Sequence, residues 1–364
     1  MSNFTIPDFQ TAGSPSTPTE QPAVSSLPGV ETSAPGLRVV TIGGGTGLST
    51  LLRGLRRHVT PYNQPGVTPG LIADLTAVVG VTDDGGSSGR LRRGFKMLPP
   101  GDLRNCMVAL SEEEDLMAQL FAHRFRSGGF LEGHNFGNLF VAALTELTGD
   151  FAHAVQLSSR ILATRGRIFP VTTANSTLVA RMDDGSLVRG ETNINASLLR
   201  IEELMIDPPH AEPLPETMEA IRNAGLITMG PGSLFTSLIT NLLVDGVSEA
   251  LAAAQGVRVY ICNLMTEANE SMDLTASEHI ERIYTHARAP IFDYALVNTT
   301  PFSEAALARY SEEKASPIIA DLERIEALGV RCIAGDFACE DGFIRHNAAR
   351  VTETLLRLGR TGRP

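Results

Sequence analysis

A dense glycine loop follows the first apolar run of the chain. Residues 39–51 read VVTIGGGTGLSTL, which is a β-branched run, a loop and then a helical pattern. Amide groups in the first turn of a helix lack partners within the helix and carry partial positive charge, and glycine lets an anion approach the backbone. This order of elements predicts a site for a phosphorylated ligand such as a nucleotide. The loop residues expected to bind it are Gly43, Gly44, Gly45, Thr46 and Gly47.

The same order of strand, loop and helix returns in residues 226–243, LITMGPGSLFTSLITNLL. In a doubly wound sheet, ligands bind at the carboxyl ends of strands where the chain reverses direction, so two such loops can face one crevice. A diphosphate would then bridge them. Neither loop matches a standard fingerprint, because Leu48 interrupts G-x-G-x-x-G and no Lys-Ser/Thr pair follows. The residues expected to bind from the second loop are Gly230, Pro231, Gly232 and Ser233.

An acidic loop, VTDDGGSSGRLRRG in residues 81–94, follows another apolar strand. Asp83 supplies the hard oxygen ligands that Mg²⁺ prefers, and we treat it as a candidate metal ligand. Ser87 and Ser88 stand among glycines that would fold over a phosphate, and Arg90 would supply a bidentate donor. The alternative is a solvated turn in which Asp83 and Asp84 cap backbone amides.

Three further polar residues are candidate ligand contacts. Asn138 belongs to a polar helix start, GHNFGN, which suggests packing over a polar ligand. Asn263 comes directly after an apolar strand, a position from which its side chain could form hydrogen bonds with a base or a sugar. Arg345 is a candidate phosphate or sugar donor, with a surface ion pair as the equal alternative. The chain has no Ser-His-Asp elbow, H-E-x-x-H or Cys-His pair, so it favours binding over turnover.

The elements that must position these residues alternate between apolar strand runs and helical patterns from Leu37 onward. Such alternation predicts an α/β fold with a doubly wound, Rossmann-like and mostly parallel sheet. We expect one domain over residues 37–364, with a helical insertion at about 102–163 and a β-hairpin at about 177–192 around Asp184-Gly185. Residues 1–36 are rich in Pro, Ser and Thr and are predicted to be a disordered tail.

Bulk composition narrows the class of protein. The formal net charge of -11 over 364 residues provides no broad positive field, which argues against binding a nucleic-acid polymer. No apolar stretch approaches the roughly 20 residues that span a bilayer, so membrane insertion is not expected. Four scattered cysteines and the lack of a secretory signal predict a cytoplasmic protein with free thiols.

Seven ordered blocks stand out between residues 37 and 358. They are GGGTGLS at 43–49, TDDGGSSGRLR at 82–92, PPGDLRNC at 99–106, GHNFGNL at 133–139, GPGSLFTSL at 230–238, CNLMTEANES at 262–271 and IRH at 344–346. Together they resemble the YvcK family, bacterial proteins related to CofD, the 2-phospho-lactate transferase of deazaflavin cofactor synthesis. The amino-terminal tail lies outside this resemblance.

The resemblance implies a CofD-like domain in a cytoplasmic protein that binds UDP-N-acetylglucosamine and related UDP-sugars. It implies a role in growth on gluconeogenic carbon sources, in cell shape and in peptidoglycan homeostasis. Arg345 matches a position tied to UDP-sugar binding in the family. Ala348 stands where some members carry a phosphorylatable threonine, so the resemblance does not extend to phosphorylation there.

We therefore expect a UDP-sugar sensor with no required cofactor that engages a regulatory protein partner, while homo-oligomerisation stays open. The rival hypothesis is a CofD-like, Mg²⁺-dependent phosphotransferase that uses a nucleotide-diphosphate-activated substrate, since the transferase relatives use a divalent metal near their acidic loop. A third reading, an NAD-dependent oxidoreductase, conflicts with Leu48 in the fingerprint.

Overall fold

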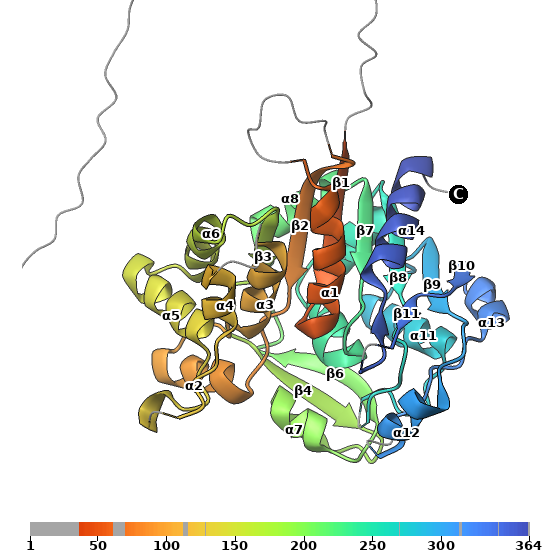
Figure 1. Cartoon of the computed structure of the whole chain (residues 1–364). Helices are drawn as coiled ribbons and strands as arrows, with labels where there is room; N and C mark the ends of the chain where they lie inside the picture. Colours follow the sequence, from red (N-terminus) through yellow and green to blue (C-terminus); the bar gives the residue numbers. More distant parts are fainter. Residues whose placement is uncertain are drawn as a thin grey trace, which may run out of the picture. The chain divides into compact units, whose positions relative to one another are not determined.

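The computed structural model describes residues 36–60, 70–111, 116–127, 129–268, 270–312, 315–340 and 342–362. Residues 1–35 of the predicted disordered tail lie outside this part. The centre of the fold is a seven-stranded sheet in which all neighbouring strands are parallel (Figure 1). In spatial order its strands are β10 (Arg331–Gly335), β9 (Tyr294–Asn298), β8 (Val257–Ile261), β7 (Leu226–Met229), β1 (Leu37–Gly43), β2 (Ile72–Val79) and β3 (Arg167–Pro170).

The chain builds this sheet outward from its middle in two directions. It runs from β1 through β2 to β3, returns to β7 beside β1, and then continues through β8 and β9 to β10. The direction of winding therefore reverses between β1 and β7. The predicted doubly wound, Rossmann-like parallel sheet is confirmed.

Apolar residues on both faces of the strands explain why the sheet is buried. Val39 packs into one hydrophobic cluster, whereas Val40 and Ile42 pack into a second cluster on the opposite face. Successive strand residues point to opposite faces, so a continuous apolar run is what a strand covered on both sides requires. β3, which was not predicted from the sequence, reads RIFP, so a charged residue and a proline leave only two apolar residues between them.

Helices cover the two faces of the sheet as two separate layers. The cluster that contains Val39 is shared with α1 (Gly45–Leu55), α3 (Gly101–Leu110), α4 (Leu116–Ala122), α5 (Phe136–Thr148), α6 (Phe151–Ile161) and α14 (Ala348–Thr361). The cluster that contains Val40 is shared with α8 (Pro215–Asn223), η3 (Leu234–Ile239), α9 (Thr240–Leu242), α10 (Val247–Ala253), α11 (Ala276–Ala287) and α13 (Leu322–Ala327).

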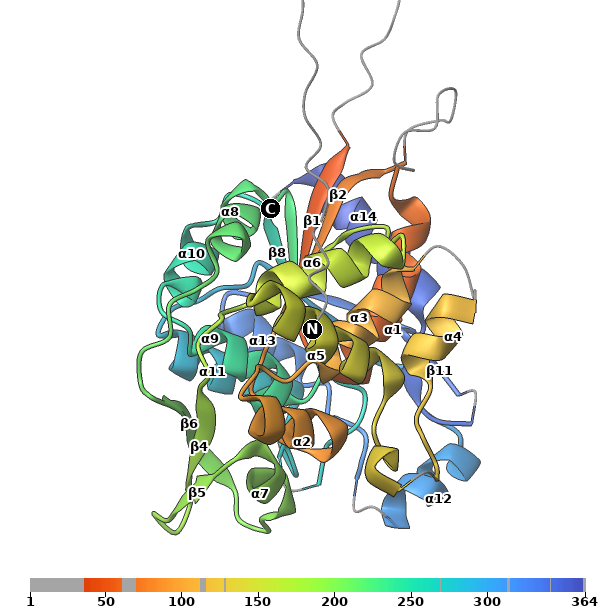
Figure 2. The ribbon, with the colours of Figure 1, turned by 90° about the vertical axis from the view of Figure 1, so that its left-hand side faces the viewer.

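The predicted helical insertion corresponds to helices α3 to α6, which lie between β2 and β3 in the chain and group together in Figure 2. The predicted hairpin is also present, because β4 (Thr177–Met182) pairs antiparallel with β5 (Leu187–Arg189). A third strand, β6 (Ile201–Asp207), completes this small sheet and was not predicted from the sequence, where Glu202 and Glu203 interrupt the apolar run.

The remaining elements are short and join the layers to the loops. They are η1 (Arg56–His58), α2 (Gly86–Phe95), η2 (Gly129–Leu131), α7 (Glu191–Ala196), α12 (Glu304–Glu312) and the hairpin of β11 (Ala338–Cys339) and β12 (Arg345–His346). Across the described ranges, no single helix is both long and apolar enough to cross a bilayer.

Candidate functional site

The two glycine loops meet where the winding of the sheet reverses, at the carboxyl ends of β1 and β7. A Cβ atom on Gly47 would lie 2.5 Å from the carbonyl oxygen of Pro231, and one on Gly232 would lie 3.4 Å from that of Gly44. A contact of 2.5 Å is shorter than real Cβ atoms tolerate, so glycine at 47 allows the loops to pack together. The predicted convergence of both loops on one crevice is therefore present in the fold.

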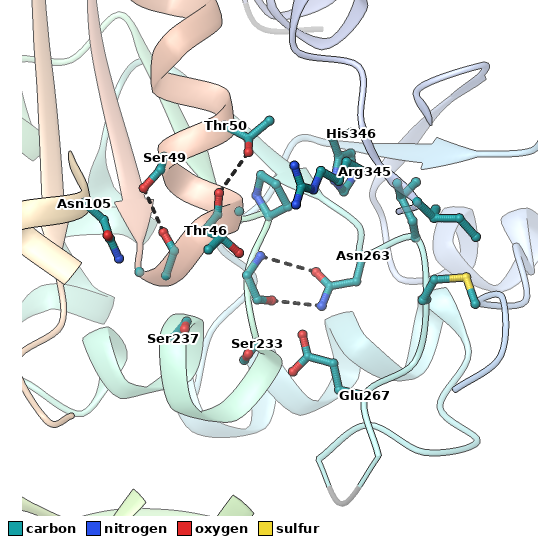
Figure 3. A pocket seen from close by; sticks show the side chains of 18 of the residues that line it. Thr46, Ser49, Thr50, Asn105, Ser233, Ser237, Asn263, Glu267, Arg345 and His346 are labelled. Carbon is teal, nitrogen blue, oxygen red and sulfur yellow. Dashed lines mark hydrogen bonds between the residues drawn. The ribbon is translucent and has the colours of Figure 1, made fainter. Parts of the chain in front are cut away.

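A cavity of about 690 Å³ opens over these loops (Figure 3). Side chains from α1, from α3, from the loop after β8 and from the β11–β12 hairpin complete its walls. Gly43 and Gly230, which adjoin the loops, do not line it. Of the residues expected from the sequence, those in its wall are Gly44, Gly45, Thr46, Gly47, Pro231, Gly232, Ser233, Asn263 and Arg345.

Three arginines face this cavity from separate elements: Arg53 on α1, Arg104 on α3 and Arg345 on β12. Burial lowers the pKa of Arg104 to about 10, so it still carries its charge at neutral pH. The guanidinium of Arg345 lies 5.5 Å from the ring centre of Phe343. Within the described part of the chain, neither Arg53 nor Arg345 forms an ion pair. A cation-rich cavity in a chain of net charge -11 suits an anionic ligand.

Asp102 lies beneath the first glycine loop and was not among the site residues expected from the sequence. No side-chain hydrogen bond caps α3. Instead the carboxylate accepts a hydrogen bond from the backbone of Gly45, and burial raises its pKa to about 6. A Cβ atom on Gly44 would lie 2.5 Å from Asp102 Oδ2, so the glycine makes room for this carboxylate.

The acidic loop does not line the cavity. Asp83 Oδ1 accepts a hydrogen bond of 2.8 Å from the amide of Gly85, and Asp84 Oδ1 accepts one of 2.8 Å from the amide of Thr192. These contacts match the alternative reading, in which both carboxylates cap backbone amides. Among the described residues, no group of three or more His, Cys, Asp or Glu side chains is arranged to hold a metal. Among these residues, Asp83 is thus not part of a metal site built from three or more such side chains.

The other residues expected near the acidic loop connect α2 to the helical insertion. Ser87 Oγ lies 3.2 Å from His134 Nδ1 and accepts a hydrogen bond from the amide of Asn135. Arg90 donates to the carbonyl oxygen of Glu132 at 2.9 Å. Ser88 is buried, and its Oγ would lie 2.4 Å from a Cβ atom on Gly101. The fold therefore separates this network from the cavity.

Asn138 is buried behind the cavity wall and reaches it only through another residue. Its Oδ1 accepts a hydrogen bond of 3.3 Å from Arg104 Nε, and Arg104 itself faces the cavity. Asn138 therefore helps to orient Arg104.

Several wall residues were not among the sequence candidates. Thr50 and Arg53 follow Thr46 on α1 at helical spacing, a signal that could have identified them. Glu267, Tyr310 and His346 reach the cavity from loops and short elements, which carry no comparable signal. His346 Nε2 lies 3.0 Å from the carbonyl oxygen of Cys262, and burial lowers its pKa to about 4, so the ring is neutral.

Comparison with known proteins assigns the family. Residues 39–338 match the family described as 2-phospho-L-lactate transferase CofD. The chain belongs to the CofD family. This CofD-family protein is 44% identical over 319 residues to a gluconeogenesis factor from Halalkalibacterium halodurans, an alignment that covers 87% of this chain and 95% of the relative. It is 42% identical over 322 residues to the gluconeogenesis factor of Bacillus subtilis, covering 88% and 98% of the two chains.

The fold of the CofD-family chain is also similar to a solved structure. The crystal structure of a UPF0052-family protein from Bacillus halodurans superposes with a TM-score of 0.82 at 44% identity, and the match covers 88% of this chain and 99% of that one. These relatives confirm the resemblance to the YvcK family. They are named gluconeogenesis factor, and their alignments cover most of both chains.

Proposed function

We propose that this protein binds a UDP-sugar, with UDP-N-acetylglucosamine as the leading ligand, in the cavity over the two glycine loops. In this proposal it is a cytoplasmic regulatory protein that supports gluconeogenic growth, cell shape and peptidoglycan homeostasis. The names of its relatives support the link to gluconeogenesis. The residue-level resemblance to the YvcK family supports the choice of ligand.

The observation that carries the proposal is the convergence of three arginines and the first turn of α1 on one cavity. An anion such as a diphosphate gains both charge complementarity and free amide donors there. The volume of about 690 Å³ lies within the range of about 300–1,000 Å³ that is usual for small-molecule sites. A nucleotide-sugar is a ligand of this size and charge.

The chemistry of the wall favours binding over turnover. Among the described residues that line the cavity there is no cysteine, and His346 is neutral and bonded to a backbone carbonyl. Serine and threonine hydroxyls are present, but Ser49 Oγ donates to Gly45 O and Thr50 Oγ1 to Thr46 O, both at 3.0 Å. No wall hydroxyl is hydrogen-bonded to a histidine that could activate it.

Calorimetric titration and thermal unfolding with UDP-N-acetylglucosamine, UDP-glucose, GDP and NAD test the proposal. A ligand at hundredfold excess over its Kd should stabilise the fold by about 2.7 kcal/mol. We expect this response from UDP-sugars and little from GDP or NAD. If no UDP-sugar produces heat or a shift, the proposal is wrong.

The family description supports one second candidate, a phosphotransferase that uses a nucleotide-diphosphate-activated substrate. This function predicts Mg²⁺-dependent consumption of the activated nucleotide in the presence of an acceptor, with loss of activity in Asp83→Asn. Product formation is measured by phosphorus NMR. Stable UDP-sugar under these conditions favours the binding protein.

A further inference from the structure

In the helix that follows the second glycine loop, η3, a buried carboxyl already occupies donors of the first turn. The buried carboxylate of Glu270 accepts hydrogen bonds from the amide of Phe235 at 3.2 Å and from the hydroxyl of Thr236 at 2.5 Å. A carboxylate at this position satisfies the first-turn donors and the partial positive charge of the helix. A phosphate at the same place would have to displace this carboxyl from the amide of Phe235 and the hydroxyl of Thr236.

A second acidic side chain stands between this helix and the cavity. Glu267 faces the cavity, and its side chain is hydrogen-bonded to Ser233. The two side chains lie next to each other in Figure 3. Burial raises the pKa of Glu267, and its proximity to Glu270 adds to the rise in the pKa of Glu270. A nearby phosphate would add further negative charge. Hydroxyl groups, in contrast, donate hydrogen bonds to a carboxyl in either protonation state.

The first glycine loop has the opposite character. The first-turn amides of α1 include those of Thr46 and Gly47, which have no partner one turn earlier in the helix. Arg53, further along the same helix, and Arg345, from β12, line the same cavity. Of the first-turn amides, Asp102 takes only that of Gly45, and Asp102 does not line the cavity. In the cavity wall itself, the free first-turn donors therefore belong to the first loop, and the acidic side chain of Glu267 lies beside the second.

We propose that the diphosphate binds to the first glycine loop and the arginines alone, while Ser233 and Glu267 bind the sugar hydroxyls beside the second loop. This inference rests on the proposed function. It replaces the expectation from the sequence that a diphosphate bridges both loops. Glu267 then favours ligands that carry a hydroxylated group on the terminal phosphate. The difference in affinity between UDP and a UDP-sugar measures how much the sugar contacts contribute to binding.

Calorimetric titration of the full chain with UDP and with UDP-N-acetylglucosamine tests this assignment. In Glu267→Ala the affinity for UDP-N-acetylglucosamine should fall about tenfold while that for UDP does not fall, because only the sugar loses a hydrogen-bond acceptor. Glu267→Gln keeps an acceptor oxygen and should retain most of the difference. Glu249→Ala on the exposed face of α10 removes the same charge far from the second loop and serves as the matched control.

Three outcomes would overturn the assignment. If Glu267→Ala lowers the affinity for both ligands equally, Glu267 only supports the loop. If the variant binds both ligands more tightly, Glu267 faces the phosphates. Equal affinity of wild-type protein for UDP and UDP-N-acetylglucosamine would leave the sugar without a subsite. Failure of the wild type to bind either ligand would instead contradict the proposed function itself.

Discussion

Asn263 and Gly232 are joined by a reciprocal pair of hydrogen bonds. Asn263 Nδ2 donates to the carbonyl oxygen of Gly232 at 2.9 Å, and the amide of Gly232 donates to Asn263 Oδ1 at 3.5 Å (Figure 3). The side-chain amide thereby ties the loop after β8 to the second glycine loop. Its polar atoms are used within the protein, so Asn263 acts mainly by positioning the cavity wall.

Asn263→Ala should lower the free energy of unfolding by about 1–3 kcal/mol, because it leaves the backbone groups of Gly232 without their partner. UDP-sugar affinity should fall with it, since the wall loses its anchor. Urea unfolding and calorimetry measure the two effects. Asn263→Asp should be at least as harmful, because a carboxylate cannot donate to the carbonyl of Gly232. Full affinity in both variants would contradict the positioning role.

Arg345→Ala should weaken UDP and UDP-N-acetylglucosamine alike, by about tenfold or more, because it removes a cation that faces the diphosphate. Raising the salt concentration should lower the ligand affinity of the wild type more than that of the variant, because salt screens the attraction between Arg345 and the diphosphate and the variant lacks this attraction. Arg331→Ala, at the start of β10 and exposed, is the control for net charge. If Arg345→Ala weakens only the UDP-sugar, the guanidinium contacts the sugar and not the phosphates.

Gly44→Ala should destabilise the fold by about 1–3 kcal/mol, because its Cβ would lie 2.5 Å from Asp102 Oδ2. The same substitution in an Asp102→Ala background should cost less, since the clash is gone. A double-mutant cycle by chemical unfolding measures this coupling. Additive effects would show that the glycine is needed for another reason.

Glu270 should make the stability of the fold depend on pH. Burial raises its pKa to about 8 from the ordinary value of 4.5. Between these values the unfolded chain loses this proton while the folded chain keeps it, so stability falls as pH rises from about 4.5 to about 8. Urea unfolding across this range should show a shallower decline for Glu270→Gln. Parallel pH profiles of the two proteins would contradict the assignment.

Glu191 contributes to the same trend and is the natural comparison. Its pKa is raised to about 9, first by burial and then by the negative charges of Asp83 and Asp102. Glu191→Gln should therefore flatten the decline as well, including its upper end between about pH 8 and 9. The two variants separate the contributions because their pH windows end at different values.

Asp83→Asn should leave UDP-sugar affinity within about twofold of wild type, because Asp83 does not line the cavity and caps the amide of Gly85. Stability should change by less than about 1 kcal/mol, because asparagine keeps an acceptor oxygen for the amide of Gly85. Calorimetry with and without Mg²⁺ measures the first effect. A large, Mg²⁺-dependent loss of affinity would restore Asp83 as a metal ligand.

Local patterns in the sequence predicted six of the seven strands of the central sheet and the two glycine loops that line the cavity. The apolar run of residues 39–42 and the glycines after it are features of adjacent residues, so they can be read without knowing what packs on them. The Asp184-Gly185 turn identified the hairpin for the same reason. Residue type alone left Arg345 equally open to a ligand contact or a surface ion pair, and the family resemblance added its link to UDP-sugar binding.

Only the tertiary structure decided which polar groups face the ligand. Asp83, Ser87 and Arg90 have the chemistry of a phosphate site, yet their hydrogen bonds go to Gly85, His134 and Glu132. Asp102 accepts a hydrogen bond from the backbone of Gly45 in the first loop, and Glu270 accepts one from the amide of Phe235 just after the second loop. Each carboxyl is distant in sequence from the loop that it contacts. Hydrogen-bond partners brought together by the crossing of strands and helices depend on three-dimensional distance, which residue type and spacing along the chain do not encode.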